Sequence, residues 1–300
     1  MRVFLAGGSG QLGRELLATA SAGVLIEAPT RAELDITDRL EVARALATVR
    51  PALVINAAAY TAVDRAETER AAAFAVNADG ARALAEAAAA AGARMIQVST
   101  DFVFDGEQSL PYLPDDEPRP LGAYGESKLA GENAVLETLA GHGLVVRTSW
   151  LYSAHGSNFV TTILRLLAER SEVSVVTDQV GSPTWARGLA GAIWKWSGMP
   201  AVWGLRHFSD AGVASWYDFA VAIRQEAAAL GLLGAAGAWA TVRPIRSAQF
   251  PTPARRPAAS VLDSFASWTE LEVTPCHWRE SLARMLAELR TGATKVPGDA

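Results

Sequence analysis

The chain opens on Met1-Arg2-Val3-Phe4-Leu5-Ala6-Gly7-Gly8-Ser9-Gly10-Gln11-Leu12-Gly13, and this stretch decides its fold class. The apolar run before the glycines predicts a β-strand, and the residues after them predict a helix. A glycine-rich turn in that position lets backbone N–H groups and the helix N-terminus approach a pyrophosphate. The alternative is a plain strand-to-helix turn without a ligand. The expected cofactor-binding residues of the turn are Gly7, Gly10, Gln11 and Leu12.

Beyond this stretch, short apolar runs alternate with Ala-rich helical runs. Strands are expected near 24–26, 52–55, 94–98 and 144–146, and helices over 39–49, 80–91 and 124–139. This rhythm predicts an α/β fold with a doubly wound parallel sheet of the Rossmann type. All nine tryptophans lie at or after Trp150. That shift predicts a dinucleotide-binding domain over 1–150 and mainly a second, smaller α/β substrate-binding domain over 151–300, with some later segments returning to the sheet.

Composition limits the partners of this chain. Its 300 residues are 50% apolar, enough for a sizeable core, and carry a formal net charge of −5. That charge argues against nonspecific binding to nucleic acid or acidic membranes, but not against an anionic small molecule held by a few arginines. No apolar run is long enough for a membrane span or a signal-peptide core. Together with a single cysteine, Cys276, these features predict a cytoplasmic protein.

The end of the second predicted strand bears on the choice of nicotinamide cofactor. In NAD-binding folds an acidic residue there holds the ribose 2′-hydroxyl. Here Thr30 and Arg31 follow Pro29, and a hydroxyl with a guanidinium fits a 2′-phosphate better than a diol. We therefore expect NADPH, with NADH as a second option, and place Asp35 and Ile36 beside the adenine. The alternative for Arg31 is a solvated loop residue.

Two later strands end in residues suited to a ligand-binding edge. Ala57, Ala58 and Ala59 follow the third strand, where small side chains would let a cofactor lie close to the backbone or would serve helix packing. Thr100 ends the fourth strand, at the carboxyl edge where open α/β sheets bind ligands.

Tyr124 and Lys128 are four residues apart on the next predicted helix and so share one face. An ammonium and the charge of an oxidised nicotinamide favour ionised tyrosine, so we expect the Tyr124 pKa below its usual value of about 10. In the reducing direction, Tyr124 would protonate the alkoxide that forms as hydride reaches a carbonyl carbon. Thr100 would bond to the same oxygen, and Lys128 would also hold the nicotinamide ribose. The alternative is an ordinary surface Tyr-Lys pair.

The order of these motifs resembles the extended short-chain dehydrogenases/reductases, and within them the dTDP-4-dehydrorhamnose reductases. The resemblance covers nearly the whole chain through residues 7–16, 56–64, 99–106, 124–132, 147–152, 178–184 and 251–257. It implies NADPH-dependent reduction of the C4 ketone of dTDP-4-dehydro-β-L-rhamnose to dTDP-L-rhamnose.

The same resemblance assigns site residues. It makes Tyr124 the proton donor and Lys128 its partner, and adds Thr61 to the cofactor contacts. Trp150 would touch the substrate, although a core position is the alternative. The remaining substrate contacts that it implies are Thr100 and Asp101 near the sugar, and Arg255 or Arg256 near the nucleotide; the alternative for the arginine pair is a solvated loop.

A magnesium site made of glutamates joins two copies in some relatives, with one ligand on the helix after a Gly-Ser-Pro-Thr turn. Here residues 185–191 follow that turn and include no acidic residue, although Glu15 and Glu288 match the remaining ligands. Two carboxylates offer too few oxygens for the cation. We therefore expect no metal, and a monomer or a weak homodimer.

Rival functions share this fold. A nucleotide-sugar 4,6-dehydratase needs an acid and a base beside the threonine, and Phe102 after Asp101 cannot transfer a proton. A nucleotide-sugar epimerase is harder to exclude, and would keep tightly bound NAD without consuming it. A nonenzymatic NADP-binding regulatory subunit would keep the cofactor pocket, but the intact Tyr124, Lys128 and Thr100 favour an enzyme.

Overall fold

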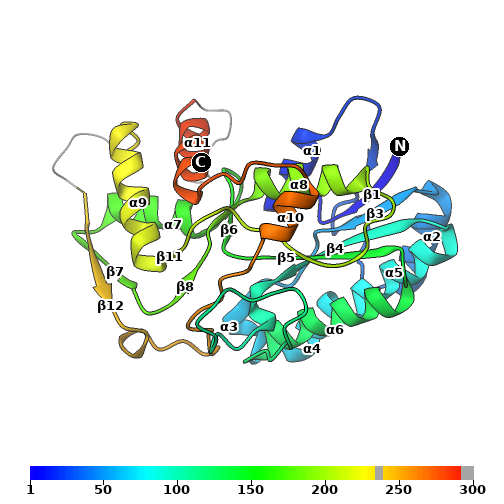
Figure 1. Cartoon of the computed structure of the whole chain (residues 1–300), viewed down its shortest axis with the longest axis horizontal. Helices are drawn as coiled ribbons and strands as arrows, with labels where there is room; N and C mark the ends of the chain where they lie inside the picture. The colour runs from blue at the N-terminus through cyan, green and yellow to red at the C-terminus, as the bar shows by residue number, and fades with distance from the viewer. Residues whose placement is uncertain (234–238, 292–300) are drawn as a thin grey trace.

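A six-stranded sheet forms the centre of the computed structural model, which describes residues 1–233 and 239–291 (Figure 1). Its strand order is β10-β5-β4-β3-β1-β2, and all neighbours are parallel. The strand order reverses between β1 and β3, so the sheet is doubly wound and the predicted fold class is confirmed. The six strands are β1 (Arg2–Ala6), β2 (Leu25–Glu27), β3 (Leu53–Asn56), β4 (Arg94–Thr100), β5 (Gly143–Thr148) and β10 (Gly204–His207).

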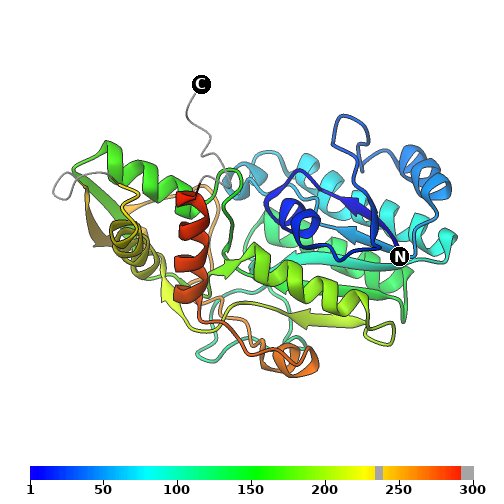
Figure 2. The same ribbon diagram turned by 90° about the horizontal axis from the view of Figure 1, so that it is seen from above.

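Helices cover both faces of this sheet (Figure 2). Side chains alternate along β1, so Val3 and Leu5 face one side and Phe4 faces the other. On the Val3 side lie α1 (Gln11–Thr19) and α8 (Ala186–Ser197), which also pack on each other. On the Phe4 side lie α2 (Arg39–Val49), α5 (Gly80–Ala91) and α6 (Ala123–Thr138).

Local signals set the boundaries of the helices. Asp38 caps α2, because its carboxylate accepts from the Leu40 and Glu41 amides at 3.0 Å. Gly92 ends α5 in the left-handed conformation, with φ 66°. Both helices therefore have the bounds expected from the sequence, 39–49 and 80–91.

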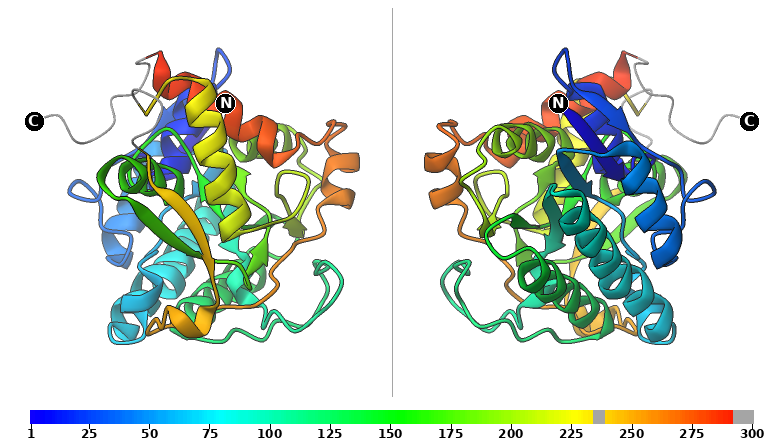
Figure 3. Two further views of the ribbon diagram at one scale, coloured as in Figure 1. Left: turned by 90° about the vertical axis from the view of Figure 1, so that its left-hand side faces the viewer. Right: turned by 90° about the vertical axis from the view of Figure 1, so that its right-hand side faces the viewer.

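A second lobe is built after residue 150 around its own apolar core. The left view of Figure 3 looks onto the strands and helices of this lobe. Its core elements are the parallel strands β7 (Glu172–Val176) and β12 (Thr241–Ile245) and the helices α7 (Phe159–Glu169), α9 (Trp216–Ala229) and α11 (Trp278–Arg290). Two short strand pairs accompany it: β6 (Leu151–Tyr152) with β9 (Thr184–Trp185), and β8 (Val180–Gly181) with antiparallel β11 (Ala214–Ser215). The chain returns to the first lobe at α8, β10 and α10 (Phe265–Glu270).

Short helical segments complete the first lobe near the ends of its strands. They are α3 (Val63–Ala66), α4 (Arg70–Phe74), a π-helical segment over Ala75–Asp79 and the 3₁₀ turn η2 (Asp101–Val103); a further 3₁₀ turn spans Ser247–Gln249. Among the described residues, no helix has both the length and the apolar character to cross a bilayer.

Candidate active site

A cleft of about 780 Å³ opens at the carboxyl ends of the central strands. The first lobe contributes the turn after β1, the ends of β3, β4 and β5, and one face of α6. The second lobe contributes Trp216 and the loop residues 155–157. The cleft therefore lies at the switch point of the doubly wound sheet, where this fold class binds its ligands.

The glycine turn forms one wall of this cleft. Gly7 has φ 83°, and a Cβ atom there would lie 2.5 Å from the Ala58 nitrogen. Only glycine fits both the conformation and the space. The α1 helix follows, and its cap, Gly10, has no side chain to occupy the first helical N–H groups. The expected cofactor residues that line this part of the cleft are Gly7, Gly10, Gln11, Leu12, Ala57, Ala58, Ala59 and Thr61.

The loop after β2 places Arg31, Asp35 and Ile36 in the cleft. Thr30 behaves differently from the expectation. Its amide and hydroxyl both donate to the Glu33 carboxylate, at 2.8 and 2.9 Å, so this hydroxyl is already engaged. Of the pair expected to face a phosphate, only Arg31 lines the cleft.

Tyr124 and Lys128 come from α6, which lies tightly against η2. A Cβ atom at Gly125 would be 2.2 Å from the Phe102 carbonyl oxygen, so the close approach requires glycine. The Lys128 ammonium donates to the Val98 carbonyl at 2.7 Å, near the end of β4. Tyr124 lines the same cleft as Thr100, at the end of β4. The sheet edge and the helix thus bring the three expected catalytic residues together.

Burial changes the acidity of this pair. It raises the pKa of Tyr124 to about 12, an effect that the Asp101 charge reinforces and the Thr100 hydrogen bond opposes. Burial also lowers the pKa of Lys128 to about 8, against the attraction of Glu132. The Tyr124 pKa was expected below its ordinary value, but the structure raises it, because burial is the largest influence and Lys128 is not among the groups that shift it. The phenol is therefore protonated at neutral pH, as a proton donor must be.

Asp101 and Trp150 also line the cleft. Burial raises the pKa of Asp101 to about 6, against hydrogen bonds from Ser260 and Thr100. Trp150 has a left-handed backbone, φ 46°, and its indole lies over Gly181. It stacks on Trp216 with ring centroids 3.5 Å apart and planes 4° from parallel. Both indoles are half-buried and line the cleft.

The structure separates the two candidate arginines. Arg256 lines the cleft and donates from Nη2 to Asp64 at 2.9 Å. Its buried Nε has no hydrogen-bond partner within the part of the chain that the structure describes. Arg255 does not line this cleft; its side chain is 71% exposed, and it lies 3.9 Å from Glu107.

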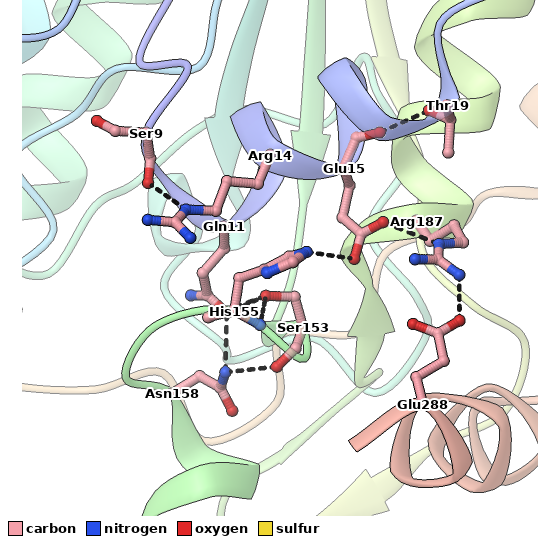
Figure 4. Close-up of polar contacts among 10 residues, drawn as sticks. All are labelled: Ser9, Gln11, Arg14, Glu15, Thr19, Ser153, His155, Asn158, Arg187 and Glu288. Carbon is pink, nitrogen blue, oxygen red and sulfur yellow. Dashed lines mark hydrogen bonds and ion pairs between the residues drawn. The ribbon is translucent and has the colours of Figure 1, made fainter. Parts of the chain in front are cut away.

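Trp216 and the loop 153–158 are site elements that sequence reasoning missed. Two residues on one face of α1 hold the loop (Figure 4). The Gln11 side-chain oxygen accepts from Ser153 at 3.1 Å and from Asn158 at 3.0 Å, and Glu15 lies 3.6 Å from the His155 ring. Neither Trp216 nor this loop carries a local motif. Only their contacts with residues far away in the sequence place them at the cleft.

Known proteins match the chain over nearly its full length. The family model described as RmlD substrate binding domain matches residues 1–291. The chain is 43% identical to dTDP-4-dehydrorhamnose reductase of Streptomyces griseus over an alignment 306 positions long, gaps included, which covers 99% of this chain and 97% of that protein. It is 40% identical to the enzyme of the same name from Escherichia coli K12, covering 97% and 99%.

A solved structure agrees with these matches. It is dTDP-4-dehydrorhamnose reductase of Bacillus anthracis in complex with NADP. Its TM-score is 0.89 at 37% identity, with 96% of this chain and 99% of that chain covered. The likeness therefore extends through both lobes.

Proposed function

We propose a function that follows from the family of this chain, which belongs to the dTDP-4-dehydrorhamnose reductases. The protein reduces the C4 ketone of dTDP-4-dehydro-β-L-rhamnose to dTDP-L-rhamnose with NADPH. The observation that carries the proposal is the placement of Tyr124, Lys128 and Thr100 in the same cleft as the glycine turn. Hydride donor and proton donor would then meet at one carbonyl group.

The chain's own residues have distinct parts in this reaction. The Gly7 turn, which has no room for a Cβ atom, and the open N-terminus of α1 fit a dinucleotide pyrophosphate. The bound cofactor supplies the hydride. Tyr124, neutral at pH 7, donates the proton to the substrate oxygen, and Thr100 bonds that oxygen as negative charge develops. Lys128 keeps a positive charge at the base of the site.

The preference for NADPH rests on Arg31. It lines the cleft after β2, where Pro29 stands in place of an acidic residue. Its guanidinium would bind the 2′-phosphate through charge-assisted hydrogen bonds. The Asp35 carboxylate nearby accepts from the Thr37 amide and hydroxyl, at 3.0 and 2.9 Å, and so has partners of its own.

The sugar nucleotide would occupy the side of the cleft near the second lobe. The stacked Trp150 and Trp216 indoles offer an apolar face for the deoxysugar. Arg256 has an unpartnered, buried Nε among the described residues, which suits it to the negatively charged diphosphate. Phe102 lies edge-on to Tyr124, with centroids 5.5 Å apart, and gives no acid or base for dehydration.

Tyr124→Phe tests the proton-donor role. The variant should lose about 10²–10⁴-fold in kcat while its affinity for NADPH stays nearly unchanged. Tyr60→Phe is the matched control. It also removes a phenol hydroxyl, which donates to Glu69 at 2.6 Å, but Tyr60 does not line the cleft. Near-normal turnover of Tyr124→Phe would remove the residue from catalysis.

A further inference from the structure

Helices from both lobes share an ion cluster behind the cofactor turn (Figure 4). Glu15 of α1 is 0% exposed, and Glu288 belongs to α11 of the second lobe. Arg187 of α8 lies between them. Its Nε donates to Glu15 at 2.8 Å, and its Nη1 donates to Glu288.

The residues of this cluster do not suit the magnesium ion that the family resemblance implies for some relatives. Its two carboxylates are already bridged by a cation that belongs to the chain. A metal ion between them would meet the Arg187 charge and would find few further oxygens. Across the described residues, no group of three or more His, Cys, Asp or Glu side chains is placed to bind a metal.

We propose that Arg187 takes the place of a divalent cation in this protein and joins the two lobes without metal. The residue at position 187 determines whether a side chain or a metal ion links the two glutamates, because its side chain lies at the centre of the cluster and contacts both of them. Trp185 fixes the direction of the guanidinium, which lies 4.9 Å from the centroid of that indole. One planar group thus makes the two directed contacts that a metal would otherwise make.

The bridge holds α11 beside the cofactor-binding part of the molecule. Helix α1, which carries Glu15, begins at the glycine turn, and α8 packs along α1. The second oxygen of Glu15 lies 3.6 Å from His155, in the loop that lines the cleft. Arg187 is therefore a positioning residue: through Glu15 and Glu288 it fixes how the two sides of the cleft meet.

Arg187→Glu tests the proposal by exchanging the internal cation for a third carboxylate. The variant should be less stable in EDTA and should gain about 5–10 °C in Tm when Mg²⁺ is present at about 100 times its Kd. Wild-type protein should show the same Tm in EDTA and in Mg²⁺. Arg165→Glu is the control: it removes an exposed pair with Glu169 of α7, and its Tm should not respond to Mg²⁺.

Arg187→Gln provides a second test if the glutamate variant does not fold. It leaves the buried Glu15 charge without its main partner, so Tm should fall by about 5–15 °C. Hydrogen exchange in α11 and loop 153–158 should rise more than in β7, which the bridge does not touch. A wild-type Tm that falls in EDTA and returns with Mg²⁺ would overturn the proposal. An Arg187→Glu variant that folds but ignores Mg²⁺ would also overturn it.

Discussion

Lys128 is buried, and burial disfavours the charged form of its ammonium group. Lys128→Met should therefore stabilise the folded protein, although it should lose most of its activity. Only 5% of this lysine is exposed. Burial moves its pKa from the ordinary 10.5 to about 8. At 1.36 kcal/mol for each pKa unit, that shift costs about 3 kcal/mol at neutral pH. Methionine has a similar length and no charge, so it removes this cost.

One lost contact offsets part of the gain. The Lys128 ammonium donates to the Val98 carbonyl, and removing that hydrogen bond costs about 1 kcal/mol. The free energy of unfolding of Lys128→Met should therefore exceed the wild-type value by about 2 kcal/mol near neutral pH. Turnover should fall by about 100-fold or more, because the ammonium beside Tyr124 is gone.

The stability difference between Lys128→Met and wild type should depend on pH. The folded-state pKa, about 8, lies below the unfolded value of 10.5. Between these values the unfolded chain binds more protons, so wild-type stability rises with pH relative to the variant. The advantage of Lys128→Met should be full below pH 8 and shrink through this window. Near pH 10.5 the burial cost is gone, so the lost hydrogen bond should leave the variant about 1 kcal/mol less stable than wild type.

Urea unfolding across this pH range is the assay, and Lys195→Met is the matched control. Lys195 is exposed, yet its ammonium also donates to a backbone carbonyl, that of Leu271, at 2.8 Å. Its replacement loses the same kind of hydrogen bond without relieving burial, so it should not stabilise the protein. A Lys128→Met variant that is less stable than wild type near neutral pH would refute the reasoning.

Three further substitutions probe the cofactor site, the substrate site and the core. Arg31→Ala should raise KM for NADPH about 10–100-fold and change KM for NADH far less. Arg39→Ala, outside the cleft, should change neither KM. An equal rise in KM for both cofactors would exclude the phosphate contact. Trp216→Ala should raise KM for the nucleotide sugar about 10–100-fold in steady-state assays, against no change for the exposed Trp203→Ala. Glu132→Gln leaves the buried Arg147 on β5 without its ionic partner and should lower the free energy of unfolding, measured in urea, by about 3–5 kcal/mol. A decrease below about 1 kcal/mol, the value for a surface ion pair, would contradict this expectation.

Local spacing explains which parts of the site were predictable. The glycine turn, the alanines after β3 and the end of β4 each follow a strand of a parallel sheet, so their edge position follows from the fold class. Tyr124 and Lys128 share a helix face because they are four residues apart. Each of these inferences needs only neighbours in the sequence.

Other features depend on contacts between distant residues, which no local pattern encodes. Trp216 reaches the cleft because it stacks on Trp150, and Arg256 does so beside Asp64, which is 192 residues away. The Tyr124 pKa was expected below its ordinary value, but burial raises it, and that burial depends on packing against Ala66 and Ala73, more than 50 residues away in the sequence. Thr30 was assigned to a phosphate, but Glu33, three residues on, accepts its hydroxyl.

Under the proposed function, this cleft delivers a hydride and a proton to a 4-keto sugar nucleotide. The most direct measurement mixes the protein with NADPH and dTDP-4-dehydro-β-L-rhamnose, and follows NADPH absorbance together with product by chromatography. We expect one dTDP-L-rhamnose formed for each NADPH oxidised, and almost none with Tyr124→Phe. No NADPH oxidation with authentic substrate, or conversion of the sugar without net consumption of cofactor as in an epimerase, would contradict it.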